Sequence, residues 1–148
     1  MYSAVEVAEY VIHYYKSISN LKLQKVLYFL QANHLVLKGK PLFEDEIEAV
    51  DFGPIVWSVY DKYKVFGGAS IPKSNKSYVD KVINSDKEIM NRLLDELKNY
   101  SSSYMLNIIQ NQAPWLRAKT EYRFNRNRFE RVHVITHQSL IEFFKEDT

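Results

Sequence analysis

The sequence NLKLQKVLYFLQANHLVL, residues 20–37, predicts a long helix at the centre of the fold. Its leucines, valines and aromatic residues fall on more than one side of a helix, so other elements must cover most of its surface. Ser19 stands in front of it as a suitable N-cap residue. Gly39 is placed to end the helix in a left-handed conformation, and Pro41 prevents it from resuming.

Apolar residues at helical spacing predict further helices on both sides of this one. They cover residues 4–17, 54–66, 86–99 and 101–110, with a further helical turn from Pro114 and a last helix after Thr136. Pro54 is expected at the first helical position of its helix, where its missing N–H costs nothing. Ser85 and Glu88 have the spacing of a capping box. The serines at 101–103 are suited to cap the next helix.

Two short extended segments interrupt the helical pattern. Residues 42–52 alternate acidic and apolar side chains, and residues 132–135 are apolar and β-branched at alternate positions. Because neither edge is stable alone, we expect residues 45–50 to pair with residues 132–135. The predicted fold is mainly α, a single compact domain over residues 1–148 with about six helices and a small two- or three-stranded antiparallel sheet. The polar, turn-rich residues 67–84 are expected to be the least ordered part.

The composition is that of an ordinary soluble domain. The 148 residues are 46% hydrophobic and 14% aromatic, which is enough to build a core without crosslinks. There is no cysteine, which excludes disulfides, cysteine-ligated zinc and thiolate nucleophiles. No uninterrupted apolar run approaches the roughly 20 residues that a membrane span needs, and the first residues lack a basic signal segment. We therefore expect a cytoplasmic protein that does not enter a membrane.

No combination of residues points to catalysis or to a bound cofactor. The four histidines lack the pattern of a helical zinc site, and four glycines are too few for a phosphate-binding loop. No serine stands in a nucleophile turn of the G-x-S-x-G type. The carboxylates of residues 44–51 could serve Mg²⁺ or acid–base chemistry, but such a run is more typical of a solvated strand edge. The prediction is a protein that is not an enzyme and holds no metal or cofactor.

The charged residues are placed unevenly, although the formal net charge is only +2. Five of the six arginines lie within residues 117–131, and five acidic residues lie within residues 44–51. The segment YRFNRNRFER, residues 122–131, interleaves arginine with aromatic residues. That combination dominates binding energy at protein interfaces, and it also neutralises phosphates while stacking on bases. The candidate partner-binding residues are Tyr122, Arg123, Phe124, Arg126, Arg128 and Phe129.

Three interpretations of this basic segment stay open. Its arginines pair with the acidic residues 44–51 of the same molecule or face water, or they bind a protein partner, or they bind nucleic acid. The low net charge favours a protein over nucleic acid as the main partner.

Several blocks of sequence occur in an order that is characteristic of one family. They are NLKLQKVLYFLQ at 20–31, GKPLF at 39–43, Glu48-Ala49, FGPIV at 52–56, Gly67-Gly68 through Ile71, APW at 113–115, and the closing residues 135–144. In order and spacing these blocks resemble the Panacea domain, which occurs in phage-associated and mobile-element proteins. One feature departs from that pattern. Where the family often has Thr-His shortly before Pro-Trp, this chain has Ile109 and Gln110.

The resemblance implies an antitoxin that neutralises a cognate toxin by direct protein binding. One branch of the family delivers its toxin to a protease as an adaptor, so a protease is a second implied partner. The alternatives are a nucleic-acid-binding regulator of phage or mobile-element origin that uses residues 122–131, and, less favoured, a hydrolase that reverses a toxin's modification.

The resemblance also covers a set of signature residues, which we expect to be structural. They are Leu23, Gln24, Lys25, Tyr28, Gly53, Pro54, Pro114 and Trp115. Several of these, with Gln31, bring polar groups onto a buried helix, and polar groups there must find partners. We expect them to bond to the backbone of residues 50–54, with contact to a toxin as the alternative.

Overall fold

A computed structural model describes residues 1–73, 80–125, 127–131 and 133–146. This part of the chain is mainly helical, as predicted from the sequence. The helices are α1 (Ala4–Tyr14), α2 (Asn20–Lys38), α3 (Trp57–Tyr63), the 3₁₀ turn η1 (Lys64–Phe66), α4 (Asn84–Leu97), α5 (Ser102–Gln110), α6 (Ala113–Thr120) and α7 (His137–Glu146). The strands are β1 (Ile47–Val50), β2 (Gly53–Ile55), β3 (Tyr122–Asn125), β4 (Arg128–Arg131) and β5 (Val134–Ile135).

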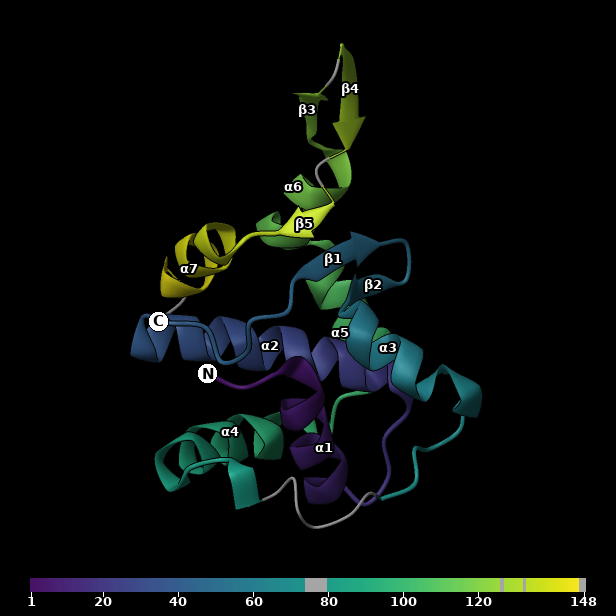
Figure 1. Cartoon of the computed structure of the whole chain (residues 1–148), viewed down its shortest axis with the longest axis vertical. Coiled ribbons are helices and arrows are strands. Elements are labelled where there is room, and N and C mark those ends of the chain that lie inside the picture. Colours follow the sequence, from purple (N-terminus) through teal and green to yellow (C-terminus); the bar gives the residue numbers. More distant parts are fainter. Residues whose placement is uncertain (74–79, 126, 132, 147–148) are drawn as a thin grey trace.

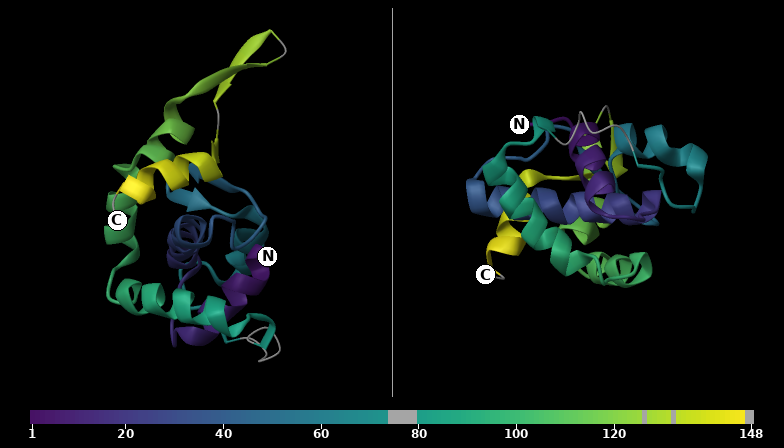
Figure 2. Two further views of the ribbon diagram at one scale, coloured as in Figure 1. Left: turned by 90° about the vertical axis from the view of Figure 1, so that its left-hand side faces the viewer. Right: turned by 90° about the horizontal axis from the view of Figure 1, so that it is seen from below.

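Helix α2 runs through the middle of the molecule, as its sequence predicts (Figure 1). Helices α1 and α4 lie on one side of it, and the three-stranded sheet with α6 and α7 lies on the other (Figures 1 and 2). It contacts α1, α3, α4, α5, α7 and β2. Twelve of its nineteen residues are buried. Most of its surface is therefore interior, and its polar residues must be satisfied by the protein itself.

The three-stranded antiparallel sheet has the order β2-β1-β5. Ile47 lies opposite Ile135 and Glu48 opposite Val134. The predicted pairing of the acidic segment with the segment after the arginines is therefore confirmed. Strand β2 completes the sheet on the other side of β1, with Ala49 opposite Pro54.

The predicted helix ends are confirmed at several places. The Ser19 side chain accepts a hydrogen bond from the Lys22 amide, and Gly39 ends α2 with φ of 72°. The Ser101 side chain caps α5, and the Thr136 hydroxyl accepts from the Ser139 amide at 3.1 Å at the start of α7. Helix α6 is longer than the single turn expected after Pro114, which lies in its first turn.

Two predictions about helix starts were wrong. Pro54 lies in β2 and not at the start of a helix, and α3 begins only at Trp57. Since β2 is an edge strand, a residue without an N–H is tolerated there. The capping box expected at Ser85 does not form, because α4 already begins at Asn84, after an N-cap Ile83 that makes no side-chain hydrogen bond. Residues 74–79 of the turn-rich segment lie outside the described residues.

The Gln31 side chain holds the chain that follows α2 against this helix. It is fully buried, donates to the Phe43 carbonyl at 2.8 Å, and accepts from the amides of Leu42 and Phe43 at 2.8 and 3.3 Å. These backbone groups lie away from water, so the amide takes the place of a strand partner for this segment. The segment leads directly into β1.

We expect Gln31→Leu to lower the free energy of unfolding by about 3 kcal/mol, because it leaves buried backbone groups without partners at nearly unchanged volume. Denaturant unfolding of the variant measures this loss. Gln138→Leu is the matched control, since Gln138 is exposed and bonds only Glu142, one turn away on α7. Equal losses in the two variants would contradict the assignment of Gln31 as the anchor.

Candidate functional site

Strands β3 and β4 form an antiparallel hairpin that projects from the body between α6 and β5 (Figures 1 and 2). Its far end marks one extreme of the molecule's longest axis (Figure 1). The sequence analysis assigned no structure to these residues, although aromatic and charged residues alternate in it with a period of two. Asn127, with φ of 67°, is a residue type that tolerates the left-handed conformation of a hairpin turn. These two signals together could have predicted the hairpin.

The pairing register sorts the candidate residues into two groups. Tyr122 is paired with Arg131 and Phe124 with Phe129, whereas Arg123 is paired with Glu130 and Asn125 with Arg128. Paired residues share a face of a ribbon, and successive residues alternate between faces. The register positions therefore place three aromatic residues and one arginine on one face and two arginines on the other. Arg126 lies outside the described residues.

The end of the hairpin is anchored to the body by the backbone of His133. Its amide donates to the Ala118 carbonyl at 3.0 Å, and its carbonyl accepts from the Ala49 amide at 2.7 Å. His133 has φ of 66°, a conformation that costs energy for a residue with a side chain. Two backbone hydrogen bonds hold it there, so the exit of the hairpin is tied to both α6 and β1.

The acidic segment divides into residues with and without internal partners. Asp51 pairs with Lys119 of α6, and its carbonyl accepts from the Gln110 side chain at 3.1 Å. Asp45 accepts from the Ala4 amide at 2.9 Å and from the Ser58 hydroxyl at 2.7 Å.

The three glutamates of this segment behave differently. Within the described part of the chain, the side chains of Glu44, Glu46 and Glu48 form no hydrogen bond or ion pair. Pairing between the acidic and basic segments is thus seen at Lys119 and Asp51, next to the base of the hairpin.

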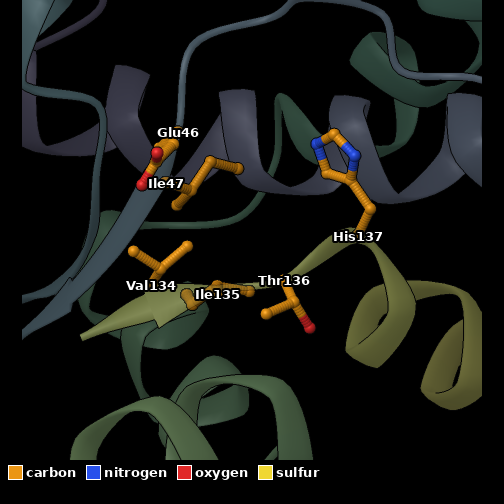
Figure 3. A pocket seen from close by; sticks show the side chains of 6 residues that line it. All are labelled: Glu46, Ile47, Val134, Ile135, Thr136 and His137. Atoms are coloured by element: carbon orange, nitrogen blue, oxygen red, sulfur yellow. The ribbon is translucent and has the colours of Figure 1, made fainter. Parts of the chain in front are cut away.

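A hollow of about 240 Å³ lies beside Glu46, where β1 and β5 meet the start of α7. Its lining residues are Glu46, Ile47, Val134, Ile135, Thr136 and His137. Figure 3 shows Glu46 and His137 on opposite sides of it, with the aliphatic side chains of Ile47 and Val134 on the side of Glu46. The hollow therefore combines an apolar wall with a carboxylate at its rim.

A second hollow, of about 280 Å³, lies beside an exposed aromatic cluster. Its lining residues are Asn20, Leu21, Phe52, Tyr60, Lys64, Gly67 and Gly68. The ring of Tyr60 lies 6.0 Å from that of Phe52 and 5.8 Å from that of Trp57, between ring centres. About two fifths of the surface of Phe52 and of Trp57 is exposed. The sequence analysis did not single out these residues as a group, because the turn between β1 and β2 brings them together.

The polar signature residues of α2 bond to other parts of the same chain. The Gln24 side chain accepts from the Val56 amide and donates to Asn20, at 2.8 and 3.0 Å. The Tyr28 hydroxyl donates to Gln112 at 2.8 Å. These contacts agree with a structural role, but they reach positions outside residues 50–54, where the sequence analysis placed their partners.

Lys25 is a buried cation on α2. It is 2% exposed, and its ammonium group donates to the Leu21 carbonyl at 3.2 Å and to the Ser102 hydroxyl at 3.0 Å. In the described part of the chain no carboxylate pairs with it. Burial lowers the pKa of Lys25 from 10.5 to about 8. The ammonium thus links α2 to the start of α5 at an electrostatic cost.

Two further signature residues, Gly53 and Trp115, lie in β2 and α6. Gly53 has φ of 118°, and a Cβ there would meet the Cδ1 atom of Leu106 at 3.1 Å, so the β1–β2 turn requires glycine. Trp115 is buried in α6, with the Lys119 ammonium 5.7 Å from its ring centre. Gln110, which stands at a position where the family often has histidine, holds the Asp51 carbonyl instead.

The histidines occupy separate places. His34 is buried and bonds the Lys40 carbonyl at 2.7 Å, while His133 and His137 belong to different elements, as expected. Nowhere in residues 1–73, 80–125, 127–131 and 133–146 do three histidine, aspartate or glutamate side chains gather as a metal would require. None of the helices in these residues has the length and apolar character needed to span a membrane.

These features define a mainly helical fold, with a central helix, a small antiparallel sheet and a projecting hairpin. The model of the family described as antitoxin SocA-like, Panacea domain matches residues 23–116. The chain therefore belongs to this family, as its sequence blocks predicted. The match runs from α2 into α6 and ends before the hairpin.

One curated relative is Antitoxin SocA of Caulobacter vibrioides (strain NA1000 / CB15N). The chain is 48% identical to it over 50 residues, which are 34% of this chain and 27% of that protein. The chain thus spans about a quarter of the length of this relative. No solved structure matches the chain.

We expect Lys25→Met to change the pH dependence of stability. Because the folded-state pKa is near 8 and the unfolded value is 10.5, only the unfolded chain holds this proton between these pH values. Lys25 therefore makes the free energy of unfolding rise with pH in that window, and its full cost is present below pH 8. Denaturant unfolding at pH 7 and pH 9.5 measures this effect. Between these pH values, the free energy of unfolding should rise more for the native protein than for Lys25→Met. An equal rise in the two proteins would contradict a lowered pKa for Lys25 in the folded state.

Proposed function

We propose that this protein is an antitoxin that neutralises a toxin protein by binding it directly. Membership of the antitoxin SocA-like family supports the antitoxin role, and the 50-residue identity with Antitoxin SocA supports it further. The observation that favours direct binding is the hairpin, a projecting ribbon that carries arginine and aromatic residues. These residue types contribute most to binding energy at protein interfaces.

We propose that the hairpin selects the partner. It lies outside the residues that the family model matches, so it is an element in which this chain can differ from other members. Its aromatic positions supply apolar contact area, and its arginines favour an acidic surface on the toxin. The family-matched body then serves as the scaffold that holds the hairpin in place, through the backbone of His133 and the pair between Lys119 and Asp51.

Binding rather than catalysis is the mechanism that we propose, with no cofactor, and we place the protein in the cytoplasm together with its toxin. Delivery of the toxin to a protease would add a second partner to the same complex. Nucleic acid is the alternative occupant of the hairpin, because a two-stranded ribbon fits the major groove of DNA. A hydrolase that reverses a toxin's modification would need only catalytic amounts of protein.

Co-expression with the product of the neighbouring gene should restore growth, and the two proteins should co-purify. The triple variant Arg123→Ala, Arg126→Ala, Arg128→Ala should bind that product at least tenfold more weakly, because it loses three charges from the hairpin. The measurement is calorimetric titration of the purified proteins. Lys16→Ala, Lys40→Ala, Lys73→Ala is the matched control, since these exposed lysines lie elsewhere and carry the same total charge.

Three outcomes would contradict the proposal. Rescue by substoichiometric protein without any complex would favour the hydrolase. Equal affinities in the two triple variants would remove the hairpin from the interface. Tight binding to DNA or RNA that weakens steeply with salt, in the absence of toxin binding, would favour the nucleic-acid regulator.

A further inference from the structure

The molecule carries two surfaces of opposite charge, and in the described part of the chain the glutamate side chains of one of them have no partner. Residues 122–131 contain four arginines and one glutamate, a net charge of +3. On the body, Glu44, Glu46 and Glu48 contribute three negative charges with no hydrogen-bond or ion-pair partner in the described part of the chain. Charges of one sign gathered on a surface attract a surface of the opposite sign over about 10 Å at moderate salt.

The geometry keeps these two surfaces apart within one molecule. The hairpin leaves the body beside β5 and runs away from the three-stranded sheet, as Figure 1 and the left view of Figure 2 show. Its exit is held in this direction by the two backbone hydrogen bonds of His133. The described ion pair between the acidic and basic segments, Lys119 with Asp51, lies at the base of the hairpin and uses none of the three glutamates.

One of these glutamates also lines an apolar hollow. Glu46 is at the rim of the 240 Å³ hollow whose wall includes Ile47 and Val134 (Figure 3). The hairpin offers the complementary combination on one face, since Phe124 and Phe129 share that face with Arg131 by register. An aromatic residue suits the apolar wall, and an arginine suits the carboxylate.

We propose that two copies of this chain associate reciprocally, each placing the aromatic face of its hairpin on the Glu46 and Glu48 side of the other copy's sheet. A two-fold arrangement makes the same contact twice, so each copy contributes both a hairpin and a sheet surface. The doubled contact compensates for the small area of one hairpin. Because the proposed toxin site uses the same hairpin, self-association and toxin binding compete.

Charge reversal tests this arrangement in the full-length protein, without any toxin. Sedimentation equilibrium at about 0.05 M sodium chloride should show the native chain as a dimer, which dissociates at about 1 M salt because the attraction is screened. The variant Glu46→Lys, Glu48→Lys should be monomeric at low salt, and so should Arg131→Glu, since Arg131 shares the aromatic face by register. The chain that combines all three changes should dimerise again, because the charges across the contact are again opposite.

If the combined variant forms the dimer again, the variants reversed on only one surface are monomeric because of their charge and not because they misfold. Phe124→Ala leaves every charge in place and should weaken the dimer at low salt, because it removes an aromatic residue from the proposed contact with the hollow. A native chain that stays monomeric at about 0.1 mM and low salt overturns the proposal, as does a combined variant that stays monomeric. These measurements use no toxin, so they do not depend on whether the protein rescues growth. Failure of the proposed function is therefore distinguishable from failure of the dimer.

Discussion

The side-chain amides of Gln24 and Gln31 hold the segments on either side of strands β1 and β2 to the central helix α2. A helix surrounded on nearly all sides has no solvent-facing stripe for its polar residues, so each polar group must be satisfied internally. Gln31 bonds the backbone of Leu42 and Phe43 before β1, and Gln24 bonds the Val56 amide after β2. The sheet is thus fastened to α2 at both ends of its first hairpin.

The hydrogen bonds of Gln24 and Gln31 also affect the position of elements at the surface. With β1 and β2 held in place, the chain requires glycine at position 53, because φ is 118° there and a Cβ would stand only 3.1 Å from Leu106 Cδ1. The turn between β1 and β2 presents Phe52 and Asp51, and Asp51 meets Lys119 on α6. Helix α6 and β1 together bind the backbone of His133, from which the hairpin extends. A chain of contacts therefore connects the buried amides of α2 to the orientation of the exposed ribbon.

The family match and the proposed binding residues occupy different parts of the chain. The matched residues 23–116 contain the central helix, the first hairpin of the sheet and the start of α6. The basic ribbon follows immediately afterwards. Such a division is physically reasonable for a binding protein, because a scaffold with a satisfied core tolerates changes in a projecting element that contributes few core contacts.

Local signals in the sequence were sufficient for most of the helices and for several of their caps. Periodicity located α2, and Ser19, Gly39, Ser101 and Thr136 marked helix ends, because caps depend on neighbours within four residues. The pairing of β1 with β5 was also predictable, since two short extended segments in a helical chain have few other partners.

Tertiary structure decided what local signals do not encode. Pro54 is a good helix start by its own chemistry, yet pairing with β1 places it in a strand. The order of arginines and aromatics in residues 122–131 looks like one mixed strip, and only the cross-strand register divides it between two faces. Whether Asp51 is paired and Glu46 is not depends on which helix packs beside each of them. These outcomes follow from contacts between residues far apart in the chain, which the spacing of neighbouring residues cannot specify.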